Sequence, residues 1–433
     1  MLVSVPDVKR ARQIKEEVTR LVAKGGFNLT KWASNRPEAV EDAFKQAYED
    51  GLDFARLGQG TQRALGCVWK PEEDVLGVKL TNMSQPATKR GVLSRLSMVF
   101  HPMGLVSPFV LRAKALVQRL WATKYAWDEP LADQELVEWD RWLSDLPCLE
   151  WVKIPRCYKT DANEAGTERR CQLHVFCDAS ETAFGAVAYF RFSSSGGHMT
   201  CFVMSRTRLA PLKQLTIVRL ELQAAVLGVR LADLIKRETT YHIDETLFWT
   251  DSAVVLRFLQ NESRRFHTFI SNRIAEVQHS SEPDQWHHVP SQCNPADFCS
   301  RGLSGCDLLQ CDLWWEGPGF VARDREEWPE EEVESAVQDA ELPELKTRTA
   351  VFTMCVFGGA LPDPARYSSW QRYKRVVAWA LRFVKNTRCK AGTGTRMAGP
   401  LTAPELRDAE EMILKESQRA VYGKELAAIS SDG

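Results

Sequence analysis

The pattern of apolar and polar residues predicts a dense run of strands and helices in the middle of the chain. Strand-like stretches occur at residues 173–178, 183–192 and 199–206. A mostly apolar helix is expected next, over residues 216–235. A short strand that ends at Asp251 follows the helix.

The run ends with two more helices, a strand and a short helix. The apolar spacing of helices occurs at residues 253–260 and 264–278. The pattern at residues 285–302 predicts a strand, a loop and a short helix that carries Asp297. The first three strands can pair as hairpins, whereas the last two need crossover connections. Residues 171–303 are therefore predicted to form an α/β domain with a mixed five-stranded sheet and helices.

Mostly helical segments are expected on both sides of this domain. Residues 1–155 contain helical stretches separated by Pro and Gly, and residues 156–170 are polar and predict a linker. Residues 304–350 are rich in Asp and Glu, which indicates a solvated, flexible acidic linker. Residues 351–433 are predicted to be a second helical segment.

Composition narrows the class of protein. The 433 residues carry a formal net charge of -1, so the chain as a whole is not an evident polyanion-binding protein. The 12 cysteines lack the spacing of a disulfide framework, which indicates a reducing compartment. No signal peptide or transmembrane segment is visible, so we expect an intracellular protein that has no membrane partner.

Two aspartates end strands that are otherwise apolar. Asp178 follows the first strand and Asp251 follows the fourth. If these two strands are parallel neighbours, their carboxyl ends bring both aspartates to the edge of the sheet where ligands bind in such folds. A carboxylate in such a place is rarely buried unless it is paired or holds a metal ion.

A glutamate on the long helix is predicted to join them. Glu221 lies near the start of the helix, on a face that continues through Ala225, Gly228 and Ala232. Because these three residues are small, the helix can approach the sheet closely and bring Glu221 to the aspartates.

Carboxylates gathered in this way favour divalent cations. They repel one another and raise one another's pKa values, and a divalent cation removes the repulsion. Mg²⁺ prefers hard oxygen ligands and keeps waters and substrate phosphates in its shell. Two such ions can activate water and stabilise the leaving oxygen in phosphodiester cleavage.

Short strings at these carboxylates point to a family. The strings are CDAS, RLEL, WTDS and NPADFCSRG. In this order they resemble the ribonuclease H region of Pol polyproteins from Pao (Bel/Pao) LTR retrotransposons. The end of that family's reverse transcriptase is resembled by two further strings, GGFNLTKWASN and LGCVWKPEED. Its thumb and connection are resembled by TKRGVLSRLSMVFHPMGLVSPF, and its pre-integrase segment by LRDAEEMILKESQ.

The resemblance implies a ribonuclease H that cuts the RNA strand of an RNA–DNA hybrid. Asp178 matches the first metal-binding aspartate, Glu221 the helix glutamate, Asp251 the aspartate after the fourth strand, and Asp297 the last acid. All four are then expected to be catalytic and to hold two Mg²⁺ ions, for which Mn²⁺ can substitute. The implied partners are the RNA–DNA hybrid and other Pol segments, in a cytoplasmic retroelement particle or the nucleus.

Two departures from the family pattern affect the expected activity. The chain contains no Asp-Asp pair of the kind that binds metal in the polymerase palm, so no DNA synthesis is expected. The loop PSQCNPAD lacks the histidine that many ribonucleases H place before the last acid, so water is expected to transfer the proton there. The alternative is an inert retroelement remnant that binds nucleic acid or a partner protein without cutting.

Two further groups of residues have competing interpretations. Arg264, Arg265, Asn272 and Arg273 could contact backbone phosphates, or could simply form a solvated helix face. The histidines and cysteines between residues 287 and 311 contain no Cys-x-x-Cys pair, so reduced thiols are favoured over a zinc site.

Overall fold

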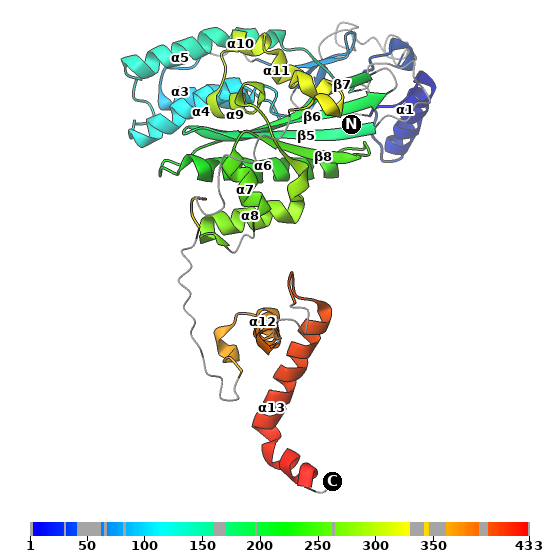
Figure 1. Ribbon diagram of the computed structural model, residues 1–433. Helices are drawn as coiled ribbons and strands as arrows, with labels where there is room; N and C mark the ends of the chain where they lie inside the picture. The colour runs from blue at the N-terminus through cyan, green and yellow to red at the C-terminus, as the bar shows by residue number, and fades with distance from the viewer. Residues whose placement is uncertain are drawn as a thin grey trace. The chain divides into compact units, whose positions relative to one another are not determined.

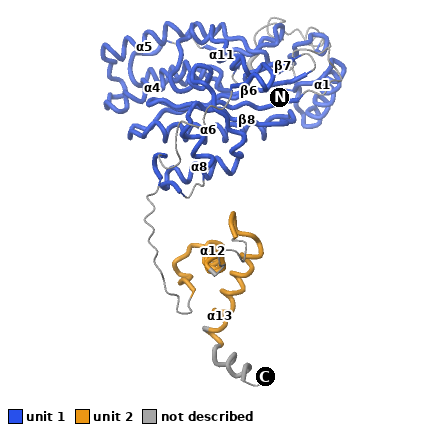
Figure 2. Tube along the Cα trace, in the orientation of Figure 1, with its two compact units in different colours: residues 1–347 blue, residues 348–433 orange. Residues whose placement is uncertain are grey.

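The computed structural model divides the chain into two compact units, residues 1–347 and residues 348–433, coloured separately in Figure 2. The described residues are 3–29, 32–40, 62–64, 67–80, 84–158, 170–194, 197–261, 265–329, 342–345, 361–388 and 397–431.

A five-stranded sheet forms the centre of the first unit, in the order β7-β6-β5-β8-β9. The β6 strand is antiparallel to β5 and β7, whereas β8 is parallel to both β5 and β9. The mixed sheet predicted for residues 171–303 is therefore confirmed. The strands are β5 (Arg170–Ala179), β6 (Ala183–Ser194), β7 (Gly197–Leu209), β8 (Glu245–Thr250) and β9 (Trp286–His288).

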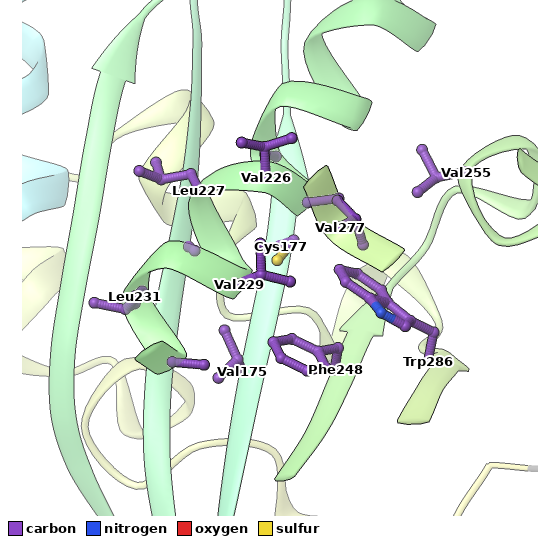
Figure 3. Packing of buried hydrophobic residues seen from close by; sticks show 14 of the residues in the cluster. Val175, Cys177, Val226, Leu227, Val229, Leu231, Phe248, Val255, Val277 and Trp286 are labelled. Carbon is purple, nitrogen blue, oxygen red and sulfur yellow. The ribbon is translucent and has the colours of Figure 1, made fainter. Parts of the chain in front are cut away.

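Three helices cover one face of this sheet: α6 (Ile217–Glu238), α7 (Ala253–Gln260) and α8 (Thr268–Ser280). Apolar side chains of α6 pack on β5 and β8, as Figure 3 shows for Val229 beside Val175 and Phe248. Gly228 permits this close approach, because a Cβ atom at that position would lie 2.3 Å from the Sγ atom of Cys177. The small-residue face predicted for this helix therefore faces the sheet.

The opposite face of the sheet is covered by helices from two distant parts of the chain (Figure 1). Phe176, Tyr189 and Trp249 of the sheet share a buried core with Phe109 of α4 and Trp314 of α11. The two faces are therefore buried by different sequence segments. The helices on this side are α3 (Lys89–Met98), α4 (Ser107–Ala122), α5 (Asp133–Asp145), α9 (Asp297–Arg301), α10 (Gly305–Leu309) and α11 (Asp312–Trp315).

Residues 304–329 belong to this core and do not form the flexible acidic linker that their composition suggests. The indole N–H of Trp314 donates to the carbonyl of Leu105 over 2.9 Å, and the hydroxyl of Tyr189 donates to the carbonyl of Trp314 over 2.8 Å. Val321 and Trp328 are also buried in the same cluster. Acidic residues alternate here with large apolar ones, and burial of the apolar residues fixes the segment.

A smaller sheet lies N-terminal to the central one in the sequence. Its strands are antiparallel neighbours in the order β1-β2-β3-β4. Asp74 accepts from the guanidinium of Arg156 at 2.6 and 2.8 Å and from the Trp69 indole at 3.0 Å. The elements of this part are α1 (Val8–Ala23), β1 (Gln62–Ala64), β2 (Cys67–Lys70), β3 (Val75–Gly77) and β4 (Ile154–Pro155).

In the second unit, the described residues are mostly helical; the sequence predicts a helical segment at residues 351–433. Helices α12 (Trp370–Arg388) and α13 (Ala403–Ser431) pack through a small apolar cluster that includes Val377 and Ile413. Arg382 forms a buried ion pair with Glu405 at 2.5 Å, which lowers the pKa of Glu405 to about 2.

Within the described part of the chain, none of the helices is both long and apolar enough to cross a membrane.

The covering helices predict how a shorter fragment behaves. A fragment of residues 170–303 would expose the sheet face that Phe109, Trp314 and Trp328 cover in the whole chain. We expect this fragment to bind the dye ANS or to aggregate, because that face is apolar. Residues 1–347 should unfold cooperatively without dye binding. Monomeric 170–303 with a melting temperature equal to that of residues 1–347 would contradict this packing.

Candidate functional site

The parallel pairing of β5 with β8 places two aspartates side by side. Cys177 lies opposite Thr250 in the register of the two strands, and Asp178 and Asp251 are the next residues of each. Adjacent strands are about 4.8 Å apart, so the two side chains start from neighbouring positions at one sheet edge. The predicted meeting of Asp178 and Asp251 follows from this register.

Glu221 approaches the same edge from the first turns of α6. Its carboxylate accepts a 2.5 Å hydrogen bond from the hydroxyl of Ser252, the residue directly after Asp251. Ser252 also caps α7, where its hydroxyl accepts from the N–H of Val255 at 3.3 Å. One hydroxyl therefore both caps α7 and fixes the carboxylate of Glu221.

The short helix α9 brings Asp297 to the site. The side-chain amide of Asn294 donates to the carbonyl of Cys177 at 3.1 Å, which fastens the loop before α9 to the end of β5. The hydroxyl of Ser300, one turn after Asp297, donates to the carboxylate of Asp178. Gly185 of β6 lets α9 lie against the sheet, because a Cβ atom there would be 2.3 Å from the Cβ of Cys299.

Burial and mutual repulsion raise the pKa values of two of the carboxyl groups. Burial raises the pKa of Asp178 to about 7, the Ser300 hydrogen bond opposes the increase, and the negative charges of Asp251 and Asp297 add to it. The pKa of Glu221 is raised by burial and by Asp251, against the hydrogen bond from Ser252. Asp178 is therefore influenced by the charges of Asp251 and Asp297, and Glu221 by that of Asp251.

The four acids nevertheless do not form a closed metal cage. Among the described residues, no group of three or more His, Cys, Asp or Glu side chains is arranged to hold a metal ion, which also leaves the zinc interpretation without support there. Four carboxylates are suitable donors for Mg²⁺ or Mn²⁺. Burial is the main cause of the raised pKa of Asp178, and the charges of Asp251 and Asp297, which add to it, are ones that a divalent cation would offset. The donor chemistry fits such an ion.

Each of the three aspartates accepts a hydrogen bond from a local partner, and the sequence interpretation did not include most of these partners. Ser291 donates to Asp251 at 2.7 Å, and Arg301 donates to Asp297 at 2.5 Å. The third donor is Ser300, which donates to Asp178. Only the i, i+4 spacing of Asp297 and Arg301 could have been recognised in the sequence.

The predicted phosphate-contacting residues differ in their surroundings. Arg264 lies outside the described residues. Arg265 is half-buried and donates to the side chain of Asn261, and Asn272 is exposed. Arg273 stacks on the ring of Phe269 at 3.4 Å and donates to the Phe269 carbonyl at 3.0 Å. Their contact with nucleic acid remains a prediction.

Comparison with known families supports the resemblance that the sequence suggests. Residues 88–252 match the family model described as the Pao retrotransposon-like RNaseH-like domain. This segment runs from the residue that caps α3 to Ser252 and includes Asp178, Glu221 and Asp251. No curated protein matches the chain.

Several solved structures resemble parts of the chain at low sequence identity. The N-terminal RNase H domain from Mycobacterium tuberculosis, solved as a fusion with maltose-binding protein, is 16% identical; the match covers 32% of this chain and 94% of that chain, with a TM-score of 0.22. The LC11-RNase H1 in complex with RNA/DNA hybrid is 14% identical, over 30% of this chain and 91% of that chain, with a TM-score of 0.22. The foamy viral protease-reverse transcriptase in complex with RNA/DNA hybrid is 12% identical, over 53% of this chain and 30% of that chain, with a TM-score of 0.31.

The raised pKa of Asp178 predicts how stability depends on pH without divalent cations. Its pKa rises on folding from 3.8 to about 7, so the folded state favours the protonated form. This contribution to stability is fully present below pH 3.8 and is lost as the pH rises through 7. At pH 8, Asp178→Asn should therefore increase the free energy of unfolding, by up to about 4 kcal/mol.

Urea unfolding of the metal-free protein between pH 4 and pH 8 measures this effect. The matched control is Asp233→Asn, because Asp233 is an exposed carboxylate on α6 that accepts a hydrogen bond from Ser280 at 3.0 Å. If the unfolding free energies of Asp178→Asn and wild type change in parallel over this pH range, burial does not disfavour the charged carboxylate of Asp178.

Proposed function

Because residues 88–252 match the Pao retrotransposon-like RNaseH-like domain, we propose that the chain is a ribonuclease H-type endonuclease that cuts the RNA strand of RNA–DNA hybrids. One observation carries the proposal. Asp178 and Asp251 follow paired residues of two parallel strands, and Glu221 and Asp297 come to the same edge from helices on opposite faces of the sheet. Four carboxylates at one sheet edge are difficult to explain by stability, since they repel one another.

The four carboxylates are proposed to hold two Mg²⁺ ions, or Mn²⁺ in their place. When bound, such ions activate water and stabilise the leaving oxygen of a phosphodiester. The chain's own residues supply orientation. Ser252 fixes Glu221 at 2.5 Å, and Ser300 keeps the buried carboxylate of Asp178 directed at α9.

Arg301 has a proposed role in substrate binding. Its guanidinium is largely exposed and lies 2.5 Å from the carboxylate of Asp297, whose hydrogen bond and charge raise the pKa of Arg301. An exposed guanidinium beside the site suits a backbone phosphate, because it offers a planar fork of donors. The loop before α9 has no histidine, so proton transfer at that point is assigned to water.

Cleavage of a labelled hybrid tests the proposal. With Mg²⁺, the full chain should shorten an RNA strand paired to DNA and leave double-stranded DNA intact. Asp251→Asn should reduce the rate at least about 100-fold, since a metal ligand contributes several kcal/mol to transition-state stabilisation. Asp233→Asn, the exposed carboxylate on α6, should cut at the wild-type rate. An Asp251→Asn variant as active as wild type would refute the assignment of the site.

The second candidate function is a non-catalytic module that binds nucleic acid or a partner protein. The observation that favours it is the open arrangement of the acids, in which serines and Arg301 occupy the carboxylates. Titration with Mg²⁺ separates the two. A nuclease should gain thermal stability from Mg²⁺ in wild type and lose that gain in Asp251→Asn, whereas an inert module should show no gain in either protein.

A further inference from the structure

Two cysteines far apart in the sequence lie in contact at the surface of the first unit. Cys148 belongs to η3, the short helix Leu146–Trp151 that follows α5, and Cys306 belongs to α10. Their Sγ atoms are 2.9 Å apart, although 158 positions separate the two residues along the chain. Figure 1 shows α10 beside α5 at this place. Local sequence does not reveal the pair, because its spacing matches no short cysteine motif.

The backbone is held in place on both sides of the pair. Leu149 of η3 and Leu308 of α10 are buried in the core on the second face of the sheet. Gly305 allows the close approach, because a Cβ atom there would overlap the carbonyl oxygen of Asp145 and lie 3.1 Å from the Cβ of Cys148. Packing therefore keeps the two sulfurs close while both cysteines are free thiols.

The two thiols differ in their access to solvent. Cys306 is exposed, whereas Cys148 is partly buried. The remaining cysteines in the part of the chain that the structure describes are buried or partly buried. Among these residues, a thiol reagent in solution therefore reaches Cys306 first.

The surroundings of Cys148 suit the second step of a thiol exchange. The hydrogen bond with Cys306 is the main cause that raises the pKa of Cys148 to about 11; burial and the charges of Cys306 and Asp145 add to it, and a backbone hydrogen bond opposes it. Two of the raising causes come from Cys306 and disappear once its sulfur has reacted. Cys148 therefore keeps its proton in the reduced pair and loses it more easily when its thiolate is needed.

We propose that Cys148 and Cys306 form a reversible disulfide by exchange with a low-molecular-weight disulfide. The sulfurs must approach from 2.9 Å to about 2.0 Å, a movement of about 0.9 Å that small side-chain rotations supply. Reversible disulfides are the kind found in reducing compartments, which the cysteine spacing of this chain indicates. The bond needs neither a metal ion nor nucleic acid, so it is independent of the proposed nuclease activity.

The bond forms in two exchange steps. The thiolate of Cys306 attacks one sulfur of the small disulfide and releases a small thiolate, which takes up the proton that Cys306 lost. The thiolate of Cys148 then attacks the sulfur of Cys306 and releases the second small thiolate, which takes up the proton of Cys148. The two cysteines lose two electrons in total, and the small disulfide is reduced to two thiols.

The bond fastens the segment that brings the fourth acid to the sheet edge. Only residues 302–304 separate α10 from α9, the helix that carries Asp297 and Arg301. In the reduced protein the same segment is held by buried Leu308 and by the N–H of Leu303, which donates to the carbonyl of Pro108 at 3.3 Å. Reduction therefore loosens this segment without unfolding the domain.

Oxidation of the full chain in mixtures of oxidised and reduced glutathione tests the inference. Remaining thiols are blocked with N-ethylmaleimide, and the protein is digested without reduction for mass spectrometry. We expect two peptides joined through Cys148 and Cys306, which separate after treatment with dithiothreitol. The melting temperature should rise by about 5 °C over that of the reduced protein, because the bond restricts the unfolded chain.

Serine variants show whether this pair is responsible. Cys148→Ser and Cys306→Ser should each lack the joined peptides and the rise in melting temperature, and their reduced forms should melt with reduced wild type. Cys148→Ser should also keep glutathione on Cys306, because the second exchange step is blocked. The matched control Cys311→Ser replaces a partly buried cysteine of the same segment, and should retain both the bond and the rise.

Three outcomes would overturn the inference. The first is the absence of the joined peptides at the highest proportion of oxidised glutathione, and the second is a bond between Cys306 of two molecules in their place. The third is an equal rise in melting temperature in wild type and Cys148→Ser, because the rise would then come from another bond. A wild type that fails to cut the RNA–DNA hybrid but forms the bond would remove the proposed nuclease and leave the disulfide.

Discussion

The parallel pairing of β5 with β8 determines where the chemistry of this chain can lie. Its register puts Asp178 and Asp251 next to each other, and the close approach of α6 at Gly228 brings the helix that carries Glu221 against the same pair of strands. A shift of one residue would turn the side chains of either strand to the opposite face. The burial of Val175 and Phe248 under α6 therefore fixes the geometry of the carboxylates as well as the core.

The site is arranged against its own electrostatic preference. Burial and neighbouring carboxylates disfavour the charged forms of Asp178 and Glu221, and hydrogen bonds from Ser300 and Ser252 partly offset this. The negative charges beside buried Asp178 are of the kind that a bound cation would offset.

The second face of the sheet links the carboxylate site to the rest of the first unit. Phe176, Tyr189 and Trp249 are covered by α4 and by the segment around Trp314, so residues far apart in the sequence stabilise one sheet. The family match that begins at residue 88 agrees with this packing, because it includes the helices α3 to α5 on this face. The domain borders expected at residues 155 and 303 do not separate compact bodies, since residues 1–347 form one unit.

The sequence alone was enough to locate the strands and helices of residues 171–303 and the four carboxylates at their ends, because local apolar spacing and strand ends are properties of short segments. It could not show that residues 304–329 are buried, because that depends on an apolar sheet face formed by other segments. Nor could it show that Ser252, Ser291 and Ser300 donate hydrogen bonds to the acids, since those contacts join α6, α9 and the ends of β5 and β8 across the fold. Tertiary packing decided these features, because only the folded chain brings such distant residues within hydrogen-bonding distance.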